Sequence, residues 1–219
     1  MKEDPSFEQL LNKLRTKLQR ASLDNMTERA RRSLESYATQ NAPLPGADVA
    51  VIVRQIADVL ETAHSAGVVH GDLKPENIIY DPESHRVELP DFEIAGAPAA
   101  SGEYQLTRGG FIIGTLLYVA PETLGGESVT PAADQYSLAT IAYFLLTGRL
   151  PYLARTPREM FRQLLSQPPI PLNQARPDLQ FEPQVEAVIM RGLAKQQQNR
   201  YPSLSTFVTE LRQALLSTE

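Results

Sequence analysis

The most informative part of the sequence is the stretch of residues 70–77, which reads HGDLKPEN. It places a carboxylate (Asp72), an ammonium group (Lys74) and an amide (Asn77) within six residues of one another. A second carboxylate, Asp91, follows nineteen residues after Asp72, in the sequence DFE. Groups of these types serve chemistry that depends on positioning and on neutralising charge. We therefore treat these four side chains as candidate catalytic and binding residues.

Helices are predicted on both sides of this stretch. Apolar residues recur on one broad face from Asp48 to Ser65, and Gly67 stops that pattern. The segment from Asp134 to Thr147 is apolar nearly all round, which predicts a buried central helix ended by Gly148. Three further helices are predicted, each opening near a proline, over residues 157–166, 183–194 and 202–216.

Strands are predicted only in the middle of the chain. Three short apolar or β-branched runs are separated by turn residues, so they predict small strands or hairpin arms. These runs are Val68-Val69, Ile78–Tyr80 and Val87–Leu89. Residues 94–114 are rich in Gly, Ala and Ser, which predicts a long irregular loop.

Residues 1–46 have a pattern of their own. Apolar side chains from Phe7 to Leu18 stand at helical spacing on one stripe. A second helix is predicted from Met26 to Tyr37, with Asp24 or Asn25 as its N-terminal cap. Both helices would be amphipathic, and the first has an apolar face that needs to be covered by something.

The sequence therefore predicts two parts. The stretch of residues 42–46 contains two prolines and a glycine and marks a linker. Residues 1–46 carry a net charge of +2 and would form the helical N-terminal segment, whereas residues 47–219 carry −7. We predict that the second part is mainly α, a helical bundle around a buried central helix with small β-hairpins.

Composition excludes several classes of protein. The chain has no cysteine, which excludes disulfide scaffolds, zinc–thiolate sites, iron–sulfur clusters and thiol nucleophiles. A net charge of −5 does not favour a nucleic-acid partner. The acidic start, Met1–Pro5, has no signal-peptide pattern, and no run approaches the roughly 18 apolar residues needed to cross a bilayer. We expect a cytoplasmic protein that does not bind membranes.

Six motifs occur in an order and spacing that resemble the C-terminal lobe of the eukaryotic-type (Hanks-type) Ser/Thr protein kinases of bacteria. The motifs are HGDLKPEN for the catalytic loop, DFE for the metal-binding DFG, GTLLYVAPE for the end of the activation segment, DQYSLA for the central helix, TGRLPY after it and NRYPS near the C-terminus. The resemblance extends from about residue 47 to 216. It implies a kinase C-lobe fold.

The resemblance implies a role for each candidate residue. Asp72 would accept the proton of the substrate hydroxyl, and Lys74 would steady the transferring phosphoryl group. Asn77 and Asp91 would hold Mg²⁺ ions that bridge the phosphates of ATP. Ile79 would form the floor beneath the adenine ring. The cofactors implied are therefore Mg²⁺ and ATP.

Further residues match positions that are structural in the family. They are His70, Phe92, Thr115, Glu122, Asp134 and Arg200. The resemblance implies that Glu122 and Arg200 form a buried pair and that Asp134 holds the backbone of the catalytic loop. We interpret His70 as a packed, hydrogen-bonded core residue, and His64 and His85 as surface or packing residues.

The sequence departs from the family where ATP would be covered. The family signature begins with a glycine-rich loop and a lysine on a strand, but the first glycine here is Gly46. The only lysines before the catalytic loop are Lys2, Lys13 and Lys17. We therefore expect two helices in place of the N-terminal lobe. ATP would then be contacted on one face only. Correct positioning of the reactants lowers the reaction barrier by roughly 7–11 kcal/mol, and most of this contribution would be lost.

Two smaller departures concern control and metal binding. Gly71 replaces the arginine that in many family members answers a phosphorylated activation loop, which argues against control by that route. Glu93 replaces the glycine after Asp-Phe, whose backbone freedom is lost, and Pro90 restricts the same turn. Asp72, Asn77 and Asp91 therefore have two interpretations, as Mg-ATP ligands or as acceptors that stabilise a loop in a scaffold.

Two functions remain open at this level. The first is a pseudokinase-like regulatory or protein-binding module, inactive alone. Its partner, another protein or a second copy, would bind through residues 1–40 or the substrate-side helices. The second is the catalytic half of a Ser/Thr kinase that transfers the γ-phosphate when an N-terminal lobe comes from another chain or from a longer gene product. Fold resemblance alone does not decide between them.

Overall fold

Helix α6 (Pro131–Thr147) lies at the centre of the fold, as its apolar sequence predicts. The structure, a computed structural model, describes residues 32–90, 116–154 and 156–217. Nearly all side chains of α6 are buried, because other elements pack around it on every side. The helix begins at Pro131, where a missing N–H costs nothing, and Gly148 ends it in the left-handed region with φ of 66°.

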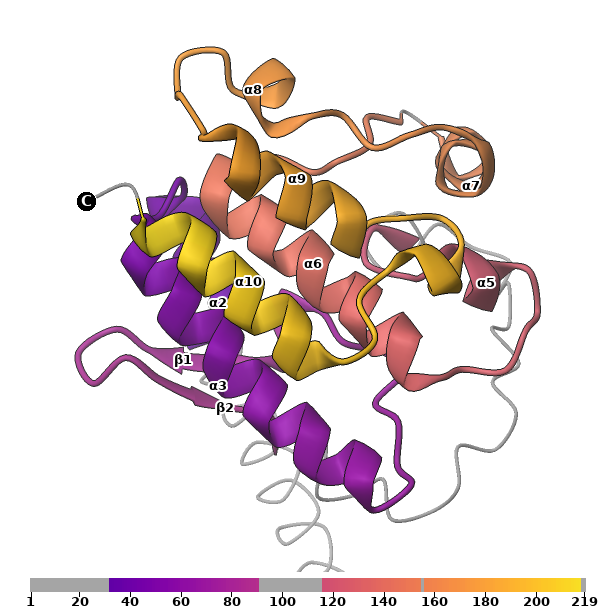
Figure 1. The fold of residues 1–219 in the computed structure, drawn as a ribbon, viewed down its shortest axis with the longest axis horizontal. Coiled ribbons are helices and arrows are strands. Elements are labelled where there is room, and N and C mark those ends of the chain that lie inside the picture. Colours follow the sequence, from indigo (N-terminus) through magenta and orange to yellow (C-terminus); the bar gives the residue numbers. More distant parts are fainter. Residues whose placement is uncertain (1–31, 91–115, 155, 218–219) are drawn as a thin grey trace, which may run out of the picture.

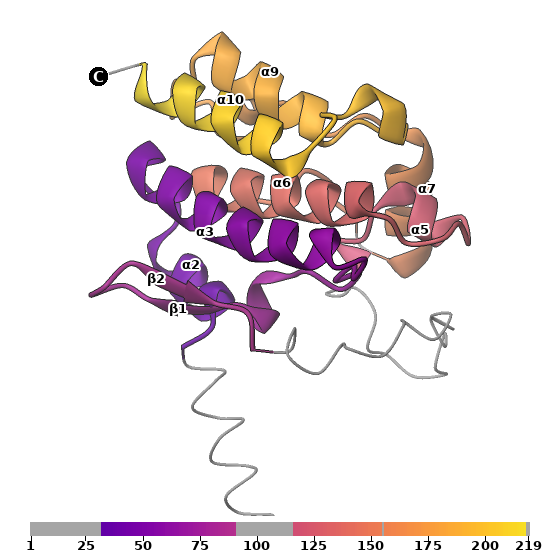
Figure 2. The ribbon, with the colours of Figure 1, turned by 60° about the horizontal axis from the view of Figure 1, so that its bottom comes forward.

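The other elements form layers around α6 (Figure 1). On one side lie α9 (Pro183–Gly192) and α10 (Leu204–Leu216), and α3 (Gly46–Ser65) lies beside α6. On the far side of α3 lie α2 (Leu34–Asn41) and the hairpin of β1 (Ile79–Asp81) and β2 (Arg86–Glu88), as Figure 2 shows. The remaining elements are short or peripheral: η1 (Pro75–Asn77), α5 (Pro121–Leu124), α7 (Pro157–Ser166), α8 (Leu172–Ala175) and η3 (Gln197–Asn199). The predicted mainly α fold around a buried central helix is confirmed.

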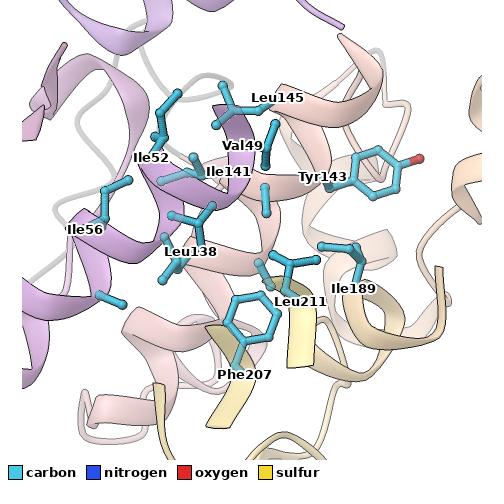
Figure 3. Close-up of a cluster of buried hydrophobic side chains, with 14 of the residues drawn as sticks. Val49, Ile52, Ile56, Leu138, Ile141, Tyr143, Leu145, Ile189, Phe207 and Leu211 are labelled. Carbon is cyan, nitrogen blue, oxygen red and sulfur yellow. The ribbon is translucent and has the colours of Figure 1, made fainter. Parts of the chain in front are cut away.

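The main core forms where α3, α6, α9 and α10 meet. Side chains from these four helices point into one interior (Figure 3), among them Ile52, Ile56, Leu138, Ile141, Ile189, Phe207 and Leu211. Each is almost completely inaccessible to solvent, and full burial of such a side chain stabilises the fold by about 1.5–3 kcal/mol. Gly192 allows α9 to approach α6 closely, since a Cβ there would lie 2.8 Å from the Cβ of Ala139.

A second, smaller core lies beneath α7. Tyr152, Met160 and Leu164 are its buried members, and the partly buried Leu116, Leu117, Leu124 and Ala154 pack against them. This cluster is separate from the main core, so α7 is attached to the protein by its own set of contacts.

The β-hairpin is antiparallel and has a third partner. Tyr80 pairs with Val87 across the two strands. On the other edge of β1, Ser33 forms an isolated antiparallel bridge with Ile79. The amide of Tyr80 donates to the carbonyl of Arg32 at 3.0 Å, and the amide of Leu34 donates to the carbonyl of Ile78 at 2.8 Å. Residues 32–34 therefore extend the hairpin.

This pairing corrects one predicted helix. Residues 26–31 of the helix expected from Met26 to Tyr37 lie outside the described residues, and in the described part the helix begins at Leu34 and continues to Asn41. Ser33 is its N-cap, and the Ser33 hydroxyl accepts a hydrogen bond from the amide of Ser36 at 3.1 Å. Extended pairing with β1 excludes Arg32 and Ser33 from the helix. The helix predicted from Phe7 to Leu18 lies outside the described residues.

Other elements also differ from the predictions, and α3 and α6 begin two and three residues earlier than predicted, at Gly46 and Pro131. Val68-Val69 forms no strand, because the amide of Val68 bonds back to the carbonyl of Ala63 at the end of α3. The last two helices end at Gly192 and begin at Leu204, so both are shorter than predicted. The predicted loop of residues 94–114 lies outside the described residues. Among the described helices, none is both long enough and apolar enough to span a bilayer.

α2 belongs to the same packed unit as the helices that follow it. Leu34 and Ala38 are buried in the main core together with residues of α3 and α6. The described residues on either side of position 46 therefore share one core, and the division of the chain into residues 1–46 and 47–219 stays a prediction.

Candidate functional site

The backbone of the stretch of residues 70–77 is held by Asp134, in the first turn of α6. This carboxylate is fully buried. Its Oδ2 accepts a hydrogen bond from the amide of His70 at 2.9 Å, and its Oδ1 accepts one from the amide of Gly71 at 2.8 Å. Its place at a helix N-terminus also favours the negative charge. The central helix thus fixes the start of this stretch.

A third group contacts the same carboxylate. Nε2 of His64, in the last turn of α3, lies 2.8 Å from Oδ2 of Asp134, and the His64 side chain is only 12% exposed. His64 was predicted as a surface or packing residue, and the structure shows it as a partner of Asp134. The two residues are 70 positions apart, so nothing local in the sequence indicates the contact.

Gly71 adopts a backbone conformation that suits glycine. Its φ is +74°, and a Cβ on this residue would lie 3.3 Å from Cγ1 of Val129. The amide of Gly71 can therefore point at Asp134 without backbone strain. The departure from the family's usual arginine at this position is compatible with a well-anchored loop.

Three of the four candidate residues converge. Nζ of Lys74 lies 3.0 Å from Oδ2 of Asp72 and 3.2 Å from its Oδ1. The side-chain amide of Asn77 donates to the backbone carbonyl of Asp72 at 3.0 Å and to its Oδ2 at 3.2 Å. The Asp72 side chain is 49% exposed, whereas that of Lys74 is 17% exposed. A carboxylate that faces solvent is thus positioned by a cation and an amide.

The arrangement fits a magnesium ligand at Asn77. Because the Nδ2 group of Asn77 is bound to Asp72, its Oδ1 remains as an acceptor, and Mg²⁺ prefers oxygen ligands. No group of three or more His, Cys, Asp or Glu side chains within residues 32–90, 116–154 and 156–217 could hold a metal. A bound Mg²⁺ would therefore need other oxygen donors beside Asn77. The predicted second ligand, Asp91, lies outside the described residues.

Two of the predicted residues lie beside this site. Ile79, the predicted adenine floor, is half-buried in β1 next to Ser33. His70 is half-buried rather than in the core, and its Nδ1 accepts from the amide of Asp72 at 3.3 Å. Phe92 and Thr115 lie outside the described residues.

Glu122 and Arg200 form a buried bidentate pair, as the resemblance implies. Nη1 and Nη2 of Arg200 lie 2.6 and 2.7 Å from the two carboxylate oxygens of Glu122. The guanidinium also donates to the carbonyls of Ala132, Ala194 and Lys195. It lies 4.9 Å from the ring centroid of Tyr136. This pair joins α5 to the segment before α10.

Lys195 was not predicted as a functional or structural residue. Its ammonium donates to the hydroxyl of Tyr152 at 2.7 Å and to the carbonyl of Leu164, in the last turn of α7, at 2.6 Å. Burial, with a contribution from Arg200, lowers the pKa of Lys195 from 10.5 to about 8. Lys195 therefore fixes the C-terminal end of α7 through a carbonyl of its last turn.

Comparison with known proteins identifies the class to which this fold and site belong. A profile of the protein kinase domain matches residues 18–213, and the chain belongs to the protein kinase family. The match begins at residue 18, so it includes α2, which the sequence had placed outside the resemblance.

Ser/Thr protein kinases of bacteria are among the similar proteins. The chain is 35% identical over 187 residues to the Ser/Thr protein kinase Pkn3 of Myxococcus xanthus, covering 84% of this chain and 34% of that protein. It is 38% identical over 187 residues to PknD of Mycobacterium tuberculosis, covering 85% of this chain and 27% of that protein. The chain therefore spans about a third or less of the length of these relatives.

Solved structures agree with this assignment. The kinase domain of PknI from Mycobacterium tuberculosis superposes with a TM-score of 0.60 at 30% identity, covering 83% of this chain and 62% of that one. Rad53 in complex with AMP-PNP superposes with a TM-score of 0.65 at 24% identity, covering 82% of this chain and 43% of that one, and it shows the shared fold. The described elements are those of a kinase C-lobe.

Proposed function

We propose that these 219 residues act as a protein-binding or regulatory module built on a kinase C-lobe, and that they do not transfer phosphate unaided. The observation that carries the proposal is a contrast within the chain. Asp72, Lys74 and Asn77 are assembled as a catalytic loop. The sequence before Gly46 contains no glycine, so it cannot form the glycine-rich loop that covers ATP in the family.

The energetic argument supports an inactive module. A nucleotide above Ile79 would be contacted from below by the described residues, and its triphosphate would have no backbone cradle from a glycine-rich loop. Phosphoryl transfer is catalysed almost entirely by positioning and by electrostatic stabilisation. Correct orientation of the reactants lowers the reaction barrier by roughly 7–11 kcal/mol. A site that contacts ATP from one side only would lose a large part of this contribution.

Two measurements test this proposal. Thermal unfolding with millimolar Mg-ATP, against MgCl₂ alone, should show no shift, whereas a ligand at 100 times its Kd would add about 2.7 kcal/mol. Incubation with γ-labelled ATP and a generic Ser/Thr substrate should give no labelled product. A clear thermal shift, or labelling by the native chain that is lost in Asp72→Asn, would overturn the proposal.

The second candidate is a catalytic half, and the loop geometry favours it. Lys74 and Asn77 both contact Asp72 and leave its carboxylate accessible, which is the arrangement that a general base requires. When bound, Mg²⁺ and ATP would supply charge neutralisation and the phosphoryl donor. Asn77 is the described residue that would hold the metal. This function requires an N-terminal lobe, supplied by another polypeptide or by a longer gene product.

The test of the second candidate adds an N-terminal lobe to the 219 residues. The N-terminal lobe of PknD can be supplied as a separate polypeptide or as a fusion, and labelling of a Ser/Thr substrate is then measured. If the chain is a catalytic half, labelling appears and is lost in Asp72→Asn. It is retained in the matched variant Asp58→Asn, whose carboxylate pairs with Arg54 on the exposed side of α3. No labelling in any combination would rule this candidate out.

A further inference from the structure

The exposed side of α7 carries apolar and basic side chains in one stripe. Arg158, Phe161, Arg162 and Leu165 are all exposed, and they follow the i, i+3, i+4, i+7 spacing of one helix face. Phe161 is 42% exposed and Leu165 is 41% exposed. We call these four residues the α7 face.

Exposed apolar surface is concentrated near this helix. Five large hydrophobic residues in the described part of the chain are exposed: Val51, Leu153, Phe161, Leu165 and Leu216. Three of the five fall between positions 153 and 165. Single exposed apolar residues are normal on a protein surface, whereas a local group of them indicates an interaction site.

The stripe is not needed to hold α7 in place. Met160 and Leu164, on the opposite side of the helix, are buried in the small core with Tyr152. Lys195 binds the carbonyls of Gln163 and Leu164 at the C-terminal end of the helix. α7 therefore presents its exposed face from a fixed backbone, which lowers the entropic cost of binding a partner.

The charge of the face identifies the chemistry of its partner. Arg158 and Arg162 stand one turn apart, and neither forms an ion pair with any residue that the structure describes. They form a basic spot on a chain whose residues 47–219 carry a net charge of −7. A hollow of about 540 Å³ beside them is lined by Thr156, Arg158, Glu159, Phe161 and Arg162.

A second copy of this chain does not fit the face. In a two-fold symmetric pair the same patch meets itself. The centre of the stripe lies between Phe161 and Arg162, so a self-complementary contact would bring the two Arg162 guanidinium groups together. Juxtaposed like charges oppose such a contact. An acidic partner avoids this repulsion and pairs both arginines.

We propose that the α7 face binds an amphipathic helix of a partner protein, with two carboxylates one turn apart beside one or two large apolar residues. The carboxylates would pair with Arg158 and Arg162, since guanidinium groups bind carboxylates in a bidentate manner. Phe161 and Leu165 would supply the apolar contact at the centre. The proposal deepens the proposed function and rests on it, because it names the surface through which the module binds.

The experiment selects the partner chemistry without assuming a partner. A displayed library of helical peptides is panned on the native chain, with counter-selection on Arg158→Glu/Arg162→Glu. The expected consensus has Asp or Glu pairs four residues apart next to Leu, Phe or Trp. A basic or polar consensus, or no enrichment over the counter-selected chain, overturns the proposal.

Binding of the consensus peptide to purified variants then locates the site. We expect Phe161→Ser and Arg158→Glu/Arg162→Glu each to weaken binding about tenfold or more. The matched controls are Val51→Ser on α3 and Arg212→Glu on α10, both exposed in the native chain, and they should bind within about twofold of the native chain. A peptide with Lys in place of the acidic residues should bind the Glu/Glu variant better than the native chain, which keeps the test decisive if one variant is unstable.

Other occupants are outcomes that contradict the proposal. Binding to phosphatidylserine vesicles that is lost in Arg158→Glu/Arg162→Glu, without peptide binding, would show a membrane site. Concentration-dependent dimerisation lost in Phe161→Ser would show a second copy. The proposed function is tested by different results: nucleotide binding or substrate labelling by the native chain would contradict it. Phosphate transfer combined with normal peptide binding would remove the inactive-module proposal and leave the α7 face standing.

Discussion

The pair of Glu122 with Arg200 and the pair of Asp72 with Lys74 join similar groups in opposite surroundings. Arg200 and Glu122 have side-chain exposures of 0% and 4%, whereas Lys74 and Asp72 have exposures of 17% and 49%. The first pair is bidentate and further bonded to backbone carbonyls. The second has one ammonium between the two oxygens of a carboxylate that faces water.

This difference separates a structural role from a chemical one. No substrate can reach Glu122, and removing either member would leave a buried charge without its partner. Asp72 can be reached from solvent, so its partners orient it without enclosing it. Both pairs belong to motifs that the sequence identifies, and burial decides which of them is available for chemistry.

The largest expected effect is at the buried pair. Glu122→Gln leaves the Arg200 guanidinium buried without a carboxylate, and we expect the free energy of unfolding to fall by about 3–5 kcal/mol. Urea denaturation measures this change. The control is Glu88→Gln, because Glu88 is 52% exposed and pairs loosely with Arg86 at 3.6 Å, and it should cost no more than about 1 kcal/mol. Equal losses in the two variants would contradict the comparison.

Asp134 extends the comparison to a buried carboxylate that binds the loop. In Asp134→Asn, an NH₂ group replaces one of the oxygens that accept the amides of His70 and Gly71. We expect a loss of about 1–3 kcal/mol and faster hydrogen exchange at these two amides. Asp58→Asn is the exposed control. Unchanged exchange at His70 and Gly71 would show that Asp134 does not hold the loop.

Lys195 lies between these two pairs in burial, as a half-buried cation that has no carboxylate partner in the part of the chain that the structure describes. Because its pKa falls from 10.5 to about 8 in the native chain, the unfolded chain binds more protons than the native chain between these values. Stability relative to Lys195→Met should therefore rise as the pH increases from about 8 to 9.5. Urea denaturation of both proteins at pH 7, 8, 9 and 9.5 checks this, and a constant difference would contradict it.

The smallest effect on stability is expected at the exposed pair. Asp72→Asn should change the free energy of unfolding by no more than about 1 kcal/mol, because the carboxylate is largely solvated and the pair is screened. Thermal unfolding at low and high salt measures it. A loss comparable to that of Glu122→Gln would mean that Asp72 is a structural residue.

The sequence predicted the elements whose pattern is set locally. The helices α3, α6 and α7 and the hairpin strands were found because hydrophobic spacing, proline and glycine mark them. The start of α2 could not be found in this way. The bridge between Ser33 and Ile79 fixes it, and those residues are 46 positions apart. Helices as short as α5 and α8 offer too few residues to show a period.

The candidate site shows the same limit. Asp72, Lys74 and Asn77 lie within six residues, and their convergence follows from that short loop. The contacts of His64 and Lys195 join elements that are distant in sequence, at α6 and at α7 respectively. A histidine in a last helical turn and a lysine in a C-terminal loop carry no local signal that identifies such partners.

The bonds between Arg32 and Tyr80 and between Leu34 and Ile78 determine where the preceding polypeptide joins the fold. Arg32, the first described residue, lies next to Ser33, which pairs with Ile79. The preceding polypeptide therefore reaches the fold close to Ile79. Any preceding segment with affinity for the surface around Ile79 would act as an intramolecular competitor, at an effective concentration in the millimolar range for a short flexible connection. A molecule added from solution would have to outcompete such a segment, which would lower the apparent affinity of that molecule for the surface.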